Sequence, residues 1–216
     1  MISGPPSASL TSSGDELDVR LLGGLQVRVG GEPVDALRSA RARSLLAFLI
    51  LHPDVAHARQ RVAFEFWPDS SEAQARTNLR NVLHTLRRAH PALDAALRAT
   101  STTLQWQPVE PVVTDAERFT SAASAAAAAD PDDADELIAR CRAALALYSG
   151  DLLAGDHDEW LLPRRDALRD EYRHTLRLLT TALIDSGHAG DATAVARELV
   201  RTDPVDESGH LSLIHI

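Results

Sequence analysis

The chain has 216 residues, of which 44% are hydrophobic and 25% are charged, a balance typical of a folded globular protein. Its longest apolar run, the seven residues from Leu45 to Leu51, is far shorter than the roughly 20 residues that a membrane-spanning helix needs. The single cysteine, Cys141, excludes an internal disulfide, and the first residues lack the basic region and apolar stretch of a secretory signal. These observations predict a cytoplasmic protein.

The charge is divided unevenly along the chain. Residues 1–110 carry 12 arginines and 11 acidic residues, a net charge of +1, whereas residues 111–216 carry 10 arginines and 20 acidic residues, a net charge of −10. The segment from Arg38 to Arg98 has a local charge of +5. Phosphates respond to the local field, so an acidic protein with such a segment can still bind nucleic acid. The asymmetry predicts two domains with different roles.

The N-terminal part is predicted to open with a small antiparallel sheet. Residues 1–16 are rich in Ser, Gly and Pro and predict a flexible leader. Residues 17–29 then alternate apolar and polar side chains around Gly23 and Gly24, as expected for strands with one buried face. A turn at Gly30-Gly31 and a short third strand over 33–37 complete the predicted sheet.

Three helices and a hairpin are predicted to follow the sheet. The first helix extends from Ser39 to a stop before Pro53, and the second covers 59–66. The third covers about 71–90, starting after a capping-box spacing of Asp69 and Glu72. Ala75, Leu79, Val82, Leu83 and Leu86 define its expected buried stripe. Residues 100–107, rich in β-prone side chains, predict a hairpin or wing.

The C-terminal part is helical by pattern. A capping box at Thr114 and Glu117 starts a helix through the alanine tract, and Asp130-Pro131-Asp132 restarts another. A long helix over 160–186 and its partner over 192–201 resemble a tetratricopeptide-type unit. The polar cluster at 156–159 is interpreted as a solvated loop or as charge at a helix N-terminus.

The polar face of the third helix is the most informative feature. Direct readout of bases in the major groove uses a helix with Arg, Asn, Gln, Ser or Thr at its exposed end. Such a face also fits an ordinary solvated helix, but the preceding sheet, the two helices and the following hairpin together indicate a winged helix. Residues of suitable type on this face are Gln74, Thr77, Arg80, Asn81 and His84, with Arg76, Arg87 and Arg88 able to reach phosphates.

The residues also resemble a known family. The segments RARSLLAFLILHP and FWPDSSEAQARTNLRNVLHTLRR are similar to the winged-helix domain of SARP-type (antibiotic regulatory protein) transcription activators. The segments VTDAERF, ALALYSGDLLAG, EWLLPRRDALRDEY and GHAGDATAVARELVRTDPVDESGH are similar to the bacterial transcriptional activator domain. The resemblance covers about 17–210, and the order of these motifs is more specific than any one of them.

The resemblance implies an α+β winged helix-turn-helix of the response-regulator type over 17–110, followed by an all-α tetratricopeptide-like domain over 111–216. It implies a transcriptional activator that binds double-stranded DNA, as a possible homodimer on tandem sites, and that recruits RNA polymerase. The implied site comprises Thr77, Asn78, Asn81 and His84 for base contacts, Arg76, Arg80, Arg87 and Arg88 for phosphates or guanines, and Thr102 and Thr103 in the wing.

Two alternatives to an activator remain open: an interaction scaffold whose winged helix does not bind DNA, or the regulatory front end of a longer, ATPase-containing regulator. The helical domain is expected to be truncated, because the family's domain extends further and residues 211–216 could be encoded by a transposon-end adapter. We find no catalytic constellation, no metal-ligand spacing and no phosphate-binding loop, and expect neither an enzyme nor a cofactor. Cys141 is interpreted as a small core residue, and the three tryptophans as packing anchors.

Overall fold

The computed structural model describes residues 16–202, and it opens with the predicted antiparallel sheet, in the order β1-β2-β3. The expected alternation is present, since Val27 and Val29 are buried while Gln26 and Arg28, which alternate with them, are exposed. The third strand is shorter and earlier than predicted, because the chain bends after Pro33. The strands are β1 Leu17–Arg20, β2 Gln26–Val29 and β3 Glu32–Pro33.

The helices of the N-terminal half confirm the three predicted ones and add a fourth. The third helix is capped by Ser71, whose Oγ accepts from the Gln74 N–H at 3.3 Å, and not by Asp69 as the spacing suggested. The chain after Pro68 turns through two more residues first, so the cap moves from Asp69 to Ser71 and Glu72 is the first helical residue. The helices are α1 Ala40–Leu51, α2 Arg59–Phe66, α3 Glu72–Ala89 and α4 Pro91–Ala96.

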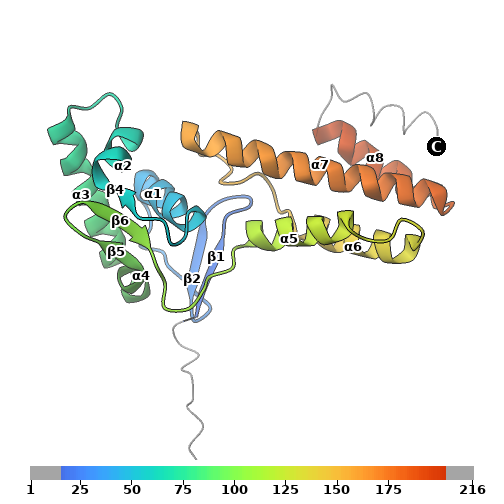
Figure 1. Ribbon diagram of the computed structural model, residues 1–216, viewed down its shortest axis with the longest axis horizontal. Coiled ribbons are helices and arrows are strands. Elements are labelled where there is room, and N and C mark those ends of the chain that lie inside the picture. Colours follow the sequence, from blue (N-terminus) through green and yellow to red (C-terminus); the bar gives the residue numbers. More distant parts are fainter. Residues whose placement is uncertain (1–15, 203–216) are drawn as a thin grey trace, which may run out of the picture.

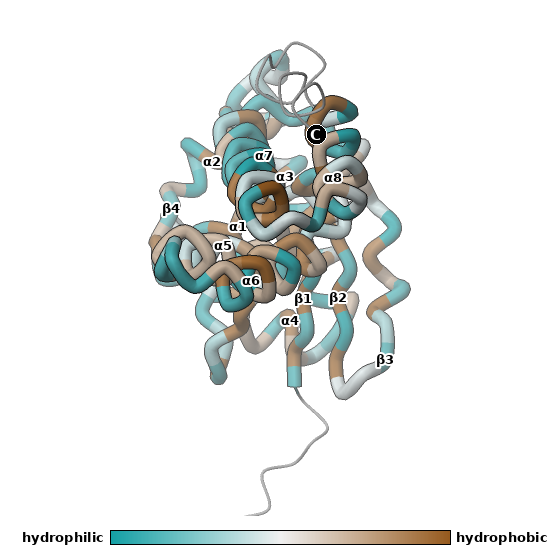
Figure 2. The backbone as a smooth tube through the Cα atoms, turned by 90° about the vertical axis from the view of Figure 1, so that its right-hand side faces the viewer, coloured by the Kyte–Doolittle hydropathy of each residue, from teal (hydrophilic) through white to brown (hydrophobic). Residues whose placement is uncertain are grey.

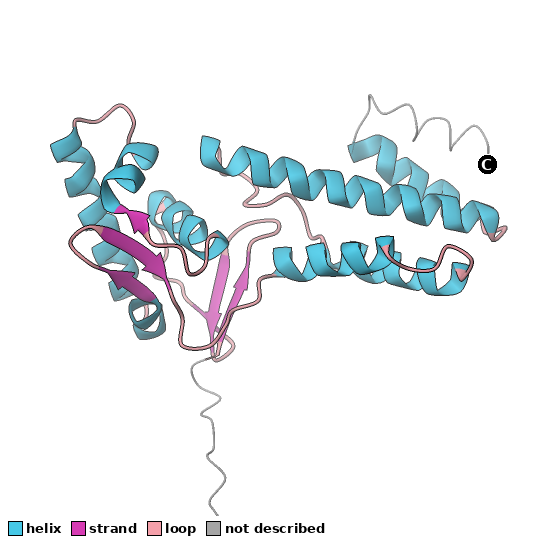
Figure 3. Ribbon diagram, viewed as in Figure 1, coloured by secondary structure: helices cyan, strands magenta, loops and turns pink. Residues whose placement is uncertain are grey.

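The hairpin predicted over 100–107 is present but begins earlier. It joins β5 Leu97–Ala99 to β6 Thr103–Trp106, and β6 also pairs with the two-residue strand β4, His57–Ala58, which precedes α2 (Figure 3). We call the turn 100–102 and its two strands the wing. Trp106 on β6 is 1% exposed, in agreement with its interpretation as a packing anchor.

The C-terminal half is helical, as predicted. The capping box is confirmed, because Thr114 Oγ1 accepts from the Glu117 N–H while the Glu117 carboxylate accepts from the Thr114 N–H. Seen along their axes, α5 and α6 form one layer, and α7 and α8 form the other (Figure 2). The elements are α5 Asp115–Ala127, α6 Ala134–Leu147, the short 3-10 turn η1 Glu159–Leu161, α7 Leu162–Asp185 and α8 Ala189–Thr202.

One hydrophobic core joins the two halves. It extends from Val19 and Leu45 in the N-terminal half to Phe119, Leu161 and Leu168 in the helical half. In Figure 1, α3 and the wing lie at one end of the molecule and the layers of α5–α8 at the other, with β1 and β2 between them. A second cluster, further from the sheet, contains Cys141 at 0% exposure, which confirms it as a core residue.

We call the contact between the halves the seam, and backbone hydrogen bonds run across it. The Asp115 carboxylate accepts from the N–H groups of Leu21 and Leu22, at 2.7 and 3.0 Å. Leu22 forms a β-bridge with Leu152. Gly23 and Gly150 approach so closely that a Cβ on Gly150 would lie 3.3 Å from the Cα of Gly23, and both have positive φ, which favours glycine.

Side chains complete the seam. Within the helical half, the buried guanidinium of Arg165 supports the loop that forms the seam, because it donates to the carbonyl oxygens of Leu152, Leu153 and Asp156 at 2.8–2.9 Å. Asp158 forms an ion pair with Arg41 of α1 at 2.7 Å and also accepts from the Ser44 hydroxyl. Asp158 lies at the N-terminus of η1, as one of the two sequence interpretations of 156–159 has it, but its carboxylate does not cap that turn and instead anchors the helical half to α1.

Some predictions lie outside the described residues. The leader at 1–16 is described only at Glu16, and the adapter-like residues 211–216 are not described. None of the helices within 16–202 is both long enough and apolar enough to cross a membrane.

Candidate nucleic-acid interface

Helix α3 presents a buried face and a polar face, as its periodicity predicts. Ala75, Leu79, Leu83 and Leu86 are buried, while Val82 is half-buried at the edge of the stripe. The opposite face turns these exposed side chains to solvent: Gln74, Thr77, Arg80, Asn81, His84 and Arg88. Thr77, Asn81, His84 and Arg88 follow one another at spacings of three or four residues, so they form a single row along the helix.

Two of the predicted base-reading groups are engaged with their own helix. Thr77 Oγ1 donates to the Ala73 carbonyl at 3.0 Å, which leaves the lone pairs of its oxygen available. The Asn78 side chain is half-buried, and its Oδ1 accepts from Gln74 Nε2 at 2.8 Å, so its NH₂ group remains the donor for a ligand. Asn81 and His84 are exposed.

The arginines of α3 fall into two kinds. Arg76 is paired with Glu72 at 3.2 Å, and Arg87 lies 3.4 Å from Asp94 of α4. Within residues 16–202, Arg80 and Arg88 have no carboxylate at ion-pair distance. Exposed pairs of this kind contribute little stability, so a phosphate can compete with Glu72 and Asp94 for their arginines.

The wing turn is ordered by hydroxyl groups. Thr100 Oγ1 accepts from the N–H groups of Thr102 and Thr103, at 3.2 and 2.9 Å, and lies 2.8 Å from Thr103 Oγ1. Of the two predicted wing residues, Thr102 is exposed at the tip, while Thr103 is half-buried and pairs with Ala58 of β4. The structure therefore presents Thr102 to solvent more fully than Thr103.

Arg59, which the sequence did not single out, lies where α2, α3 and the wing meet. Its N–H donates to the Thr102 carbonyl at 2.8 Å, and its Nη1 donates to the Thr100 carbonyl at 3.1 Å. Burial, and then the positive charges of Arg87 and Arg80, lower the pKa of the Arg59 guanidinium. No spacing rule links residues 59, 80, 87 and 100, so only the folded chain brings these groups together.

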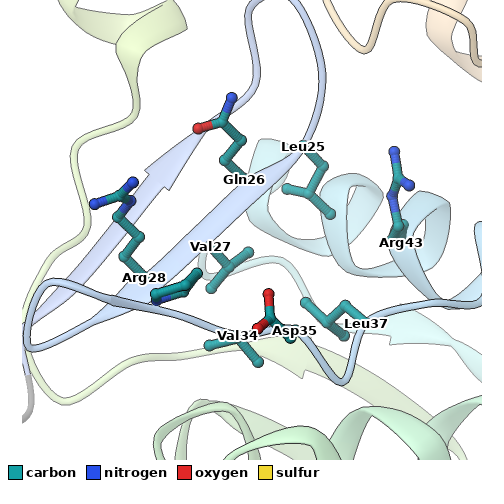
Figure 4. Close-up of a pocket in the computed structure, with 9 residues that line it drawn as sticks. Leu25, Gln26, Val27, Arg28, Val34, Asp35, Leu37 and Arg43 are labelled. Carbon is teal, nitrogen blue, oxygen red and sulfur yellow. The ribbon is translucent and has the colours of Figure 1, made fainter.

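A shallow hollow of about 360 Å³ lies between β2 and the segment after β3 (Figure 4). Leu25, Val27, Val34 and Leu37 line it beside the Asp35 carboxylate, and the guanidinium of Arg43 points away from that carboxylate. It contains no paired acid and base, and no nucleophile beside a base. In the part of the chain that the structure describes, no three His, Cys, Asp or Glu residues gather into a metal site.

Comparisons with known proteins agree with this architecture. Residues 114–215 match the sequence model of the family described as "Bacterial transcriptional activator domain". A solved structure of Mycobacterium tuberculosis EmbR, in complex with a low-affinity phosphopeptide, superimposes with a TM-score of 0.74 at 24% sequence identity, over 92% of this chain and 54% of the EmbR chain. This chain thus spans about half the length of EmbR. A search of curated protein sequences gave no match.

The fold defines the class of protein: an N-terminal winged helix, with its sheet and wing, followed by an all-helical domain. Residues 114–215 match the family of the bacterial transcriptional activator domain, in agreement with the resemblance that this segment shows in the sequence. The likeness to EmbR shows that the two chains share a fold. The family matched here is regulatory rather than enzymatic.

Proposed function

We propose that this protein is a sequence-specific DNA-binding transcriptional activator whose helix α3 enters the major groove. The observation that carries the proposal is the exposed row of Thr77, Asn81, His84 and Arg88 on α3, with a wing beside it. Hydrogen-bonding side chains on one face of a groove-sized helix are what base readout needs. The two arginines on this face that have no carboxylate partner in the described chain supply charge for phosphates.

The proposed roles follow the chemistry of each side chain. Thr77, Asn78, Asn81 and His84 contact base edges, and their hydrogen bonds read the sequence. The arginines position the helix through phosphates or guanines, and the wing contacts the backbone or the minor groove. The proposed arginines are Arg76, Arg80, Arg87 and Arg88, and the wing residues are Thr102 and Thr103.

The seam supports a further part of the proposal. We divide the chain into a DNA-binding domain over 17–110 and an activator domain over 111–216, with the second placing two copies on tandem sites and contacting RNA polymerase in the cytoplasm. A partner that binds α5–α8 is held at a fixed orientation to α3, because the halves share one core and the contacts of Asp115 and Asp158.

Selection from random duplex DNA, with purified residues 1–216 at near-physiological salt, tests the proposal. We expect an enriched motif, repeated in tandem near one helical turn apart if two subunits bind. Affinity for that motif should fall steeply with salt, because each phosphate contact releases counterions. If neither this chain nor one extended at its C-terminus selects any sequence, the activator is refuted and the scaffold is favoured.

A further inference from the structure

Aromatic rings of the two halves meet beside the ion pair that joins Arg41 to Asp158. Trp160 of η1 stacks on Phe66 of α2, with ring centroids 6.2 Å apart and ring planes at 29°, and stands edge-on to Phe48 of α1, at 5.2 Å. Phe66 is 2% exposed, and the other two rings are half-buried. Aromatic pairs in such arrangements attract one another beyond the burial of their surface. Trp160 therefore holds the helical half against α1 and α2.

Arg41 links the same end of α2 to the helical half. Its guanidinium lies 5.9 Å from the ring centroids of Phe66, the last residue of α2, and of Trp67, which follows it. The guanidinium also pairs with the Asp158 carboxylate at 2.7 Å, two residues before Trp160. A cation over aromatic rings is attracted by their π faces. Charge and ring packing thus both fix the C-terminal end of α2 to the segment that carries Trp160.

The N-terminal end of α2 holds the wing. Arg59, the first residue of α2, donates its backbone N–H to the Thr102 carbonyl at 2.8 Å and its Nη1 to the Thr100 carbonyl at 3.1 Å. The helix has eight residues and is therefore about 12 Å long, short enough to move as one rigid piece. A displacement of Phe66 at one end must consequently move Arg59 and the wing turn at the other.

A second set of contacts leads from Trp160 to the wing through the ring of Phe48. Phe48 lies 4.8 Å from the ring of His57, measured between centroids. His57 belongs to β4 and is paired with Leu104 of β6, one of the two strands of the wing. Both sets of contacts begin at the same tryptophan and end at the same hairpin.

We propose that Trp160, although it belongs to the helical half, is a positioning residue for DNA binding that sets the placement of α2 and of the wing. The inference rests on the proposed DNA-binding function and deepens it, because it makes the helical half responsible for the geometry of a DNA-contacting element. The Trp160 Nε1 is buried and has no hydrogen-bond partner in the described chain. A buried donor without an acceptor costs free energy, so what Trp160 contributes is the packing of its rings.

The first measurement needs no DNA. Hydrogen exchange of the free protein reports how firmly the wing is held. Trp160→Leu removes the ring contacts, and should raise the exchange rates of the amides at 57–59 and 100–104 at least about threefold. Trp160→Phe keeps an aromatic ring and should bring these rates back towards those of wild type. Unchanged rates at 57–59 and 100–104 in Trp160→Leu overturn the inference.

Asp115→Asn is the matched control, because it weakens the seam away from α2 and the wing. The Asp115 carboxylate accepts from the N–H groups of Leu21 and Leu22. Its loss should raise exchange at those two residues and leave the wing as in wild type. If Asp115→Asn loosens the wing as much as Trp160→Leu does, the effect is a general one of weakening the seam, and Trp160 has no positioning role.

The second measurement is DNA affinity, from fluorescence anisotropy of two labelled duplexes, one of random sequence and one selected. Affinities are expressed per folded molecule, with the folded fraction taken from circular dichroism. We expect Trp160→Leu to weaken both duplexes roughly tenfold, because a displaced wing loses contacts that do not depend on sequence, and Asp115→Asn to stay within about twofold of wild type. Equal affinities for Trp160→Leu and wild type overturn the inference.

A second variant covers the case in which Trp160→Leu is largely unfolded. Arg41→Met removes the cation between Asp158 and the end of α2 and leaves Trp160 in place, so it should loosen the wing in the same direction. Unchanged exchange in the wing of Arg41→Met then overturns the inference. If wild type binds neither duplex, the proposed function fails, whatever the exchange shows. If wild type binds DNA and the Trp160 variants bind it equally well, this inference alone fails.

Discussion

Arginine is the cation both on the exposed face of α3 and at the seam, but its role differs between these two regions. Across the seam, Arg41 is paired with Asp158. In the helical half, beside the seam, Arg165 has three carbonyl acceptors and Arg169 is paired with Asp151. On α3, Arg80 and Arg88 extend into solvent with no carboxylate partner in the described chain. An arginine whose donors are satisfied inside the chain stabilises the fold, whereas one without partners remains available to a ligand. Whether an arginine has acceptors within the chain therefore distinguishes a structural role from a ligand-binding role better than the residue type does.

The largest expected effect tests the structural role at the seam. Arg165→Met leaves three carbonyl oxygens in the 152–156 loop without their donor, and should lower the free energy of unfolding by on the order of 3–5 kcal/mol. Urea denaturation followed by circular dichroism measures the change. Arg164→Met is the control, because that neighbouring arginine is exposed and should stay within about 0.5 kcal/mol of wild type. Equal stability of the two variants would contradict the structural role of Arg165.

A second prediction concerns the hidden face of α3. Leu83 is 5% exposed, so Leu83→Ala creates a cavity and should cost about 2–5 kcal/mol of stability whatever the protein binds. The midpoint of urea denaturation measures this loss of stability. In dilute denaturant, the DNA affinity of the folded fraction of the variant should equal that of wild type. A loss of DNA affinity greater than the unfolded fraction would show that the two faces of α3 are not independent.

The third prediction concerns Asn81 on the exposed face of α3, two residues before Leu83. Asn81→Ala should weaken binding to selected DNA by about 1–3 kcal/mol while sparing random duplexes, because an amide that pairs with a base edge reads sequence. Anisotropy titrations against both duplexes measure the difference, with a thermal melt to show that stability is unchanged. An equal loss on both duplexes would remove Asn81 from base readout.

Arg88→Ala sharpens the contrast between readout and positioning. Arg88 has no carboxylate partner within 16–202, so its loss should lower affinity for every duplex by a similar factor and reduce the salt slope by about 1. The same titrations, repeated at several salt concentrations, provide the slope. A loss confined to the selected site would instead assign Arg88 to guanine contact.

The smallest expected effect is on pH dependence. Burial first, and then the charges of His52 and Arg61, lower the pKa of His57 in the folded state, so folding disfavours its protonation. Its contribution to stability is therefore complete above the ordinary histidine pKa of about 6.5 and is lost as the pH falls below that value. His57→Phe keeps a ring beside Phe48 and removes the titration. Its urea midpoint should fall less than that of wild type between pH 7.5 and 5.5; an equal fall would contradict the prediction.

Periodicity predicted most of the fold because the buried faces are regular. The α1, α2 and α3 helices, the strands around Val19 and Val27 and the capping box at Thr114 were all readable from local pattern. Helix α4 was missed because Pro91 reads as a stop, whereas here it opens a new turn capped by His90, whose Nδ1 accepts from the Ala92 N–H.

The candidate site was only partly readable. The exposed row on α3 follows from helical spacing, so its members were named from the sequence; their contacts with DNA stay predictions. Arg59 and Asp158 were missed for one reason, namely that their partners lie 41 and 117 residues away in the chain. Local sequence patterns carry no information about contacts between residues so far apart in the chain. A charged residue that is paired in the fold also cannot be told from an unpaired one by its sequence alone.

Because Gly23 and Gly150 approach closely, the residue that one half can carry at position 150 depends on the other half, which constrains how the two halves evolve. Recombination within the loop 107–114 would join this N-terminal half to a foreign helical half, and any side chain at position 150 would then meet the backbone of Gly23. Such chimeras should be tolerated only when the incoming half also brings glycine to that position. The two halves of this chain are thus expected to be inherited together.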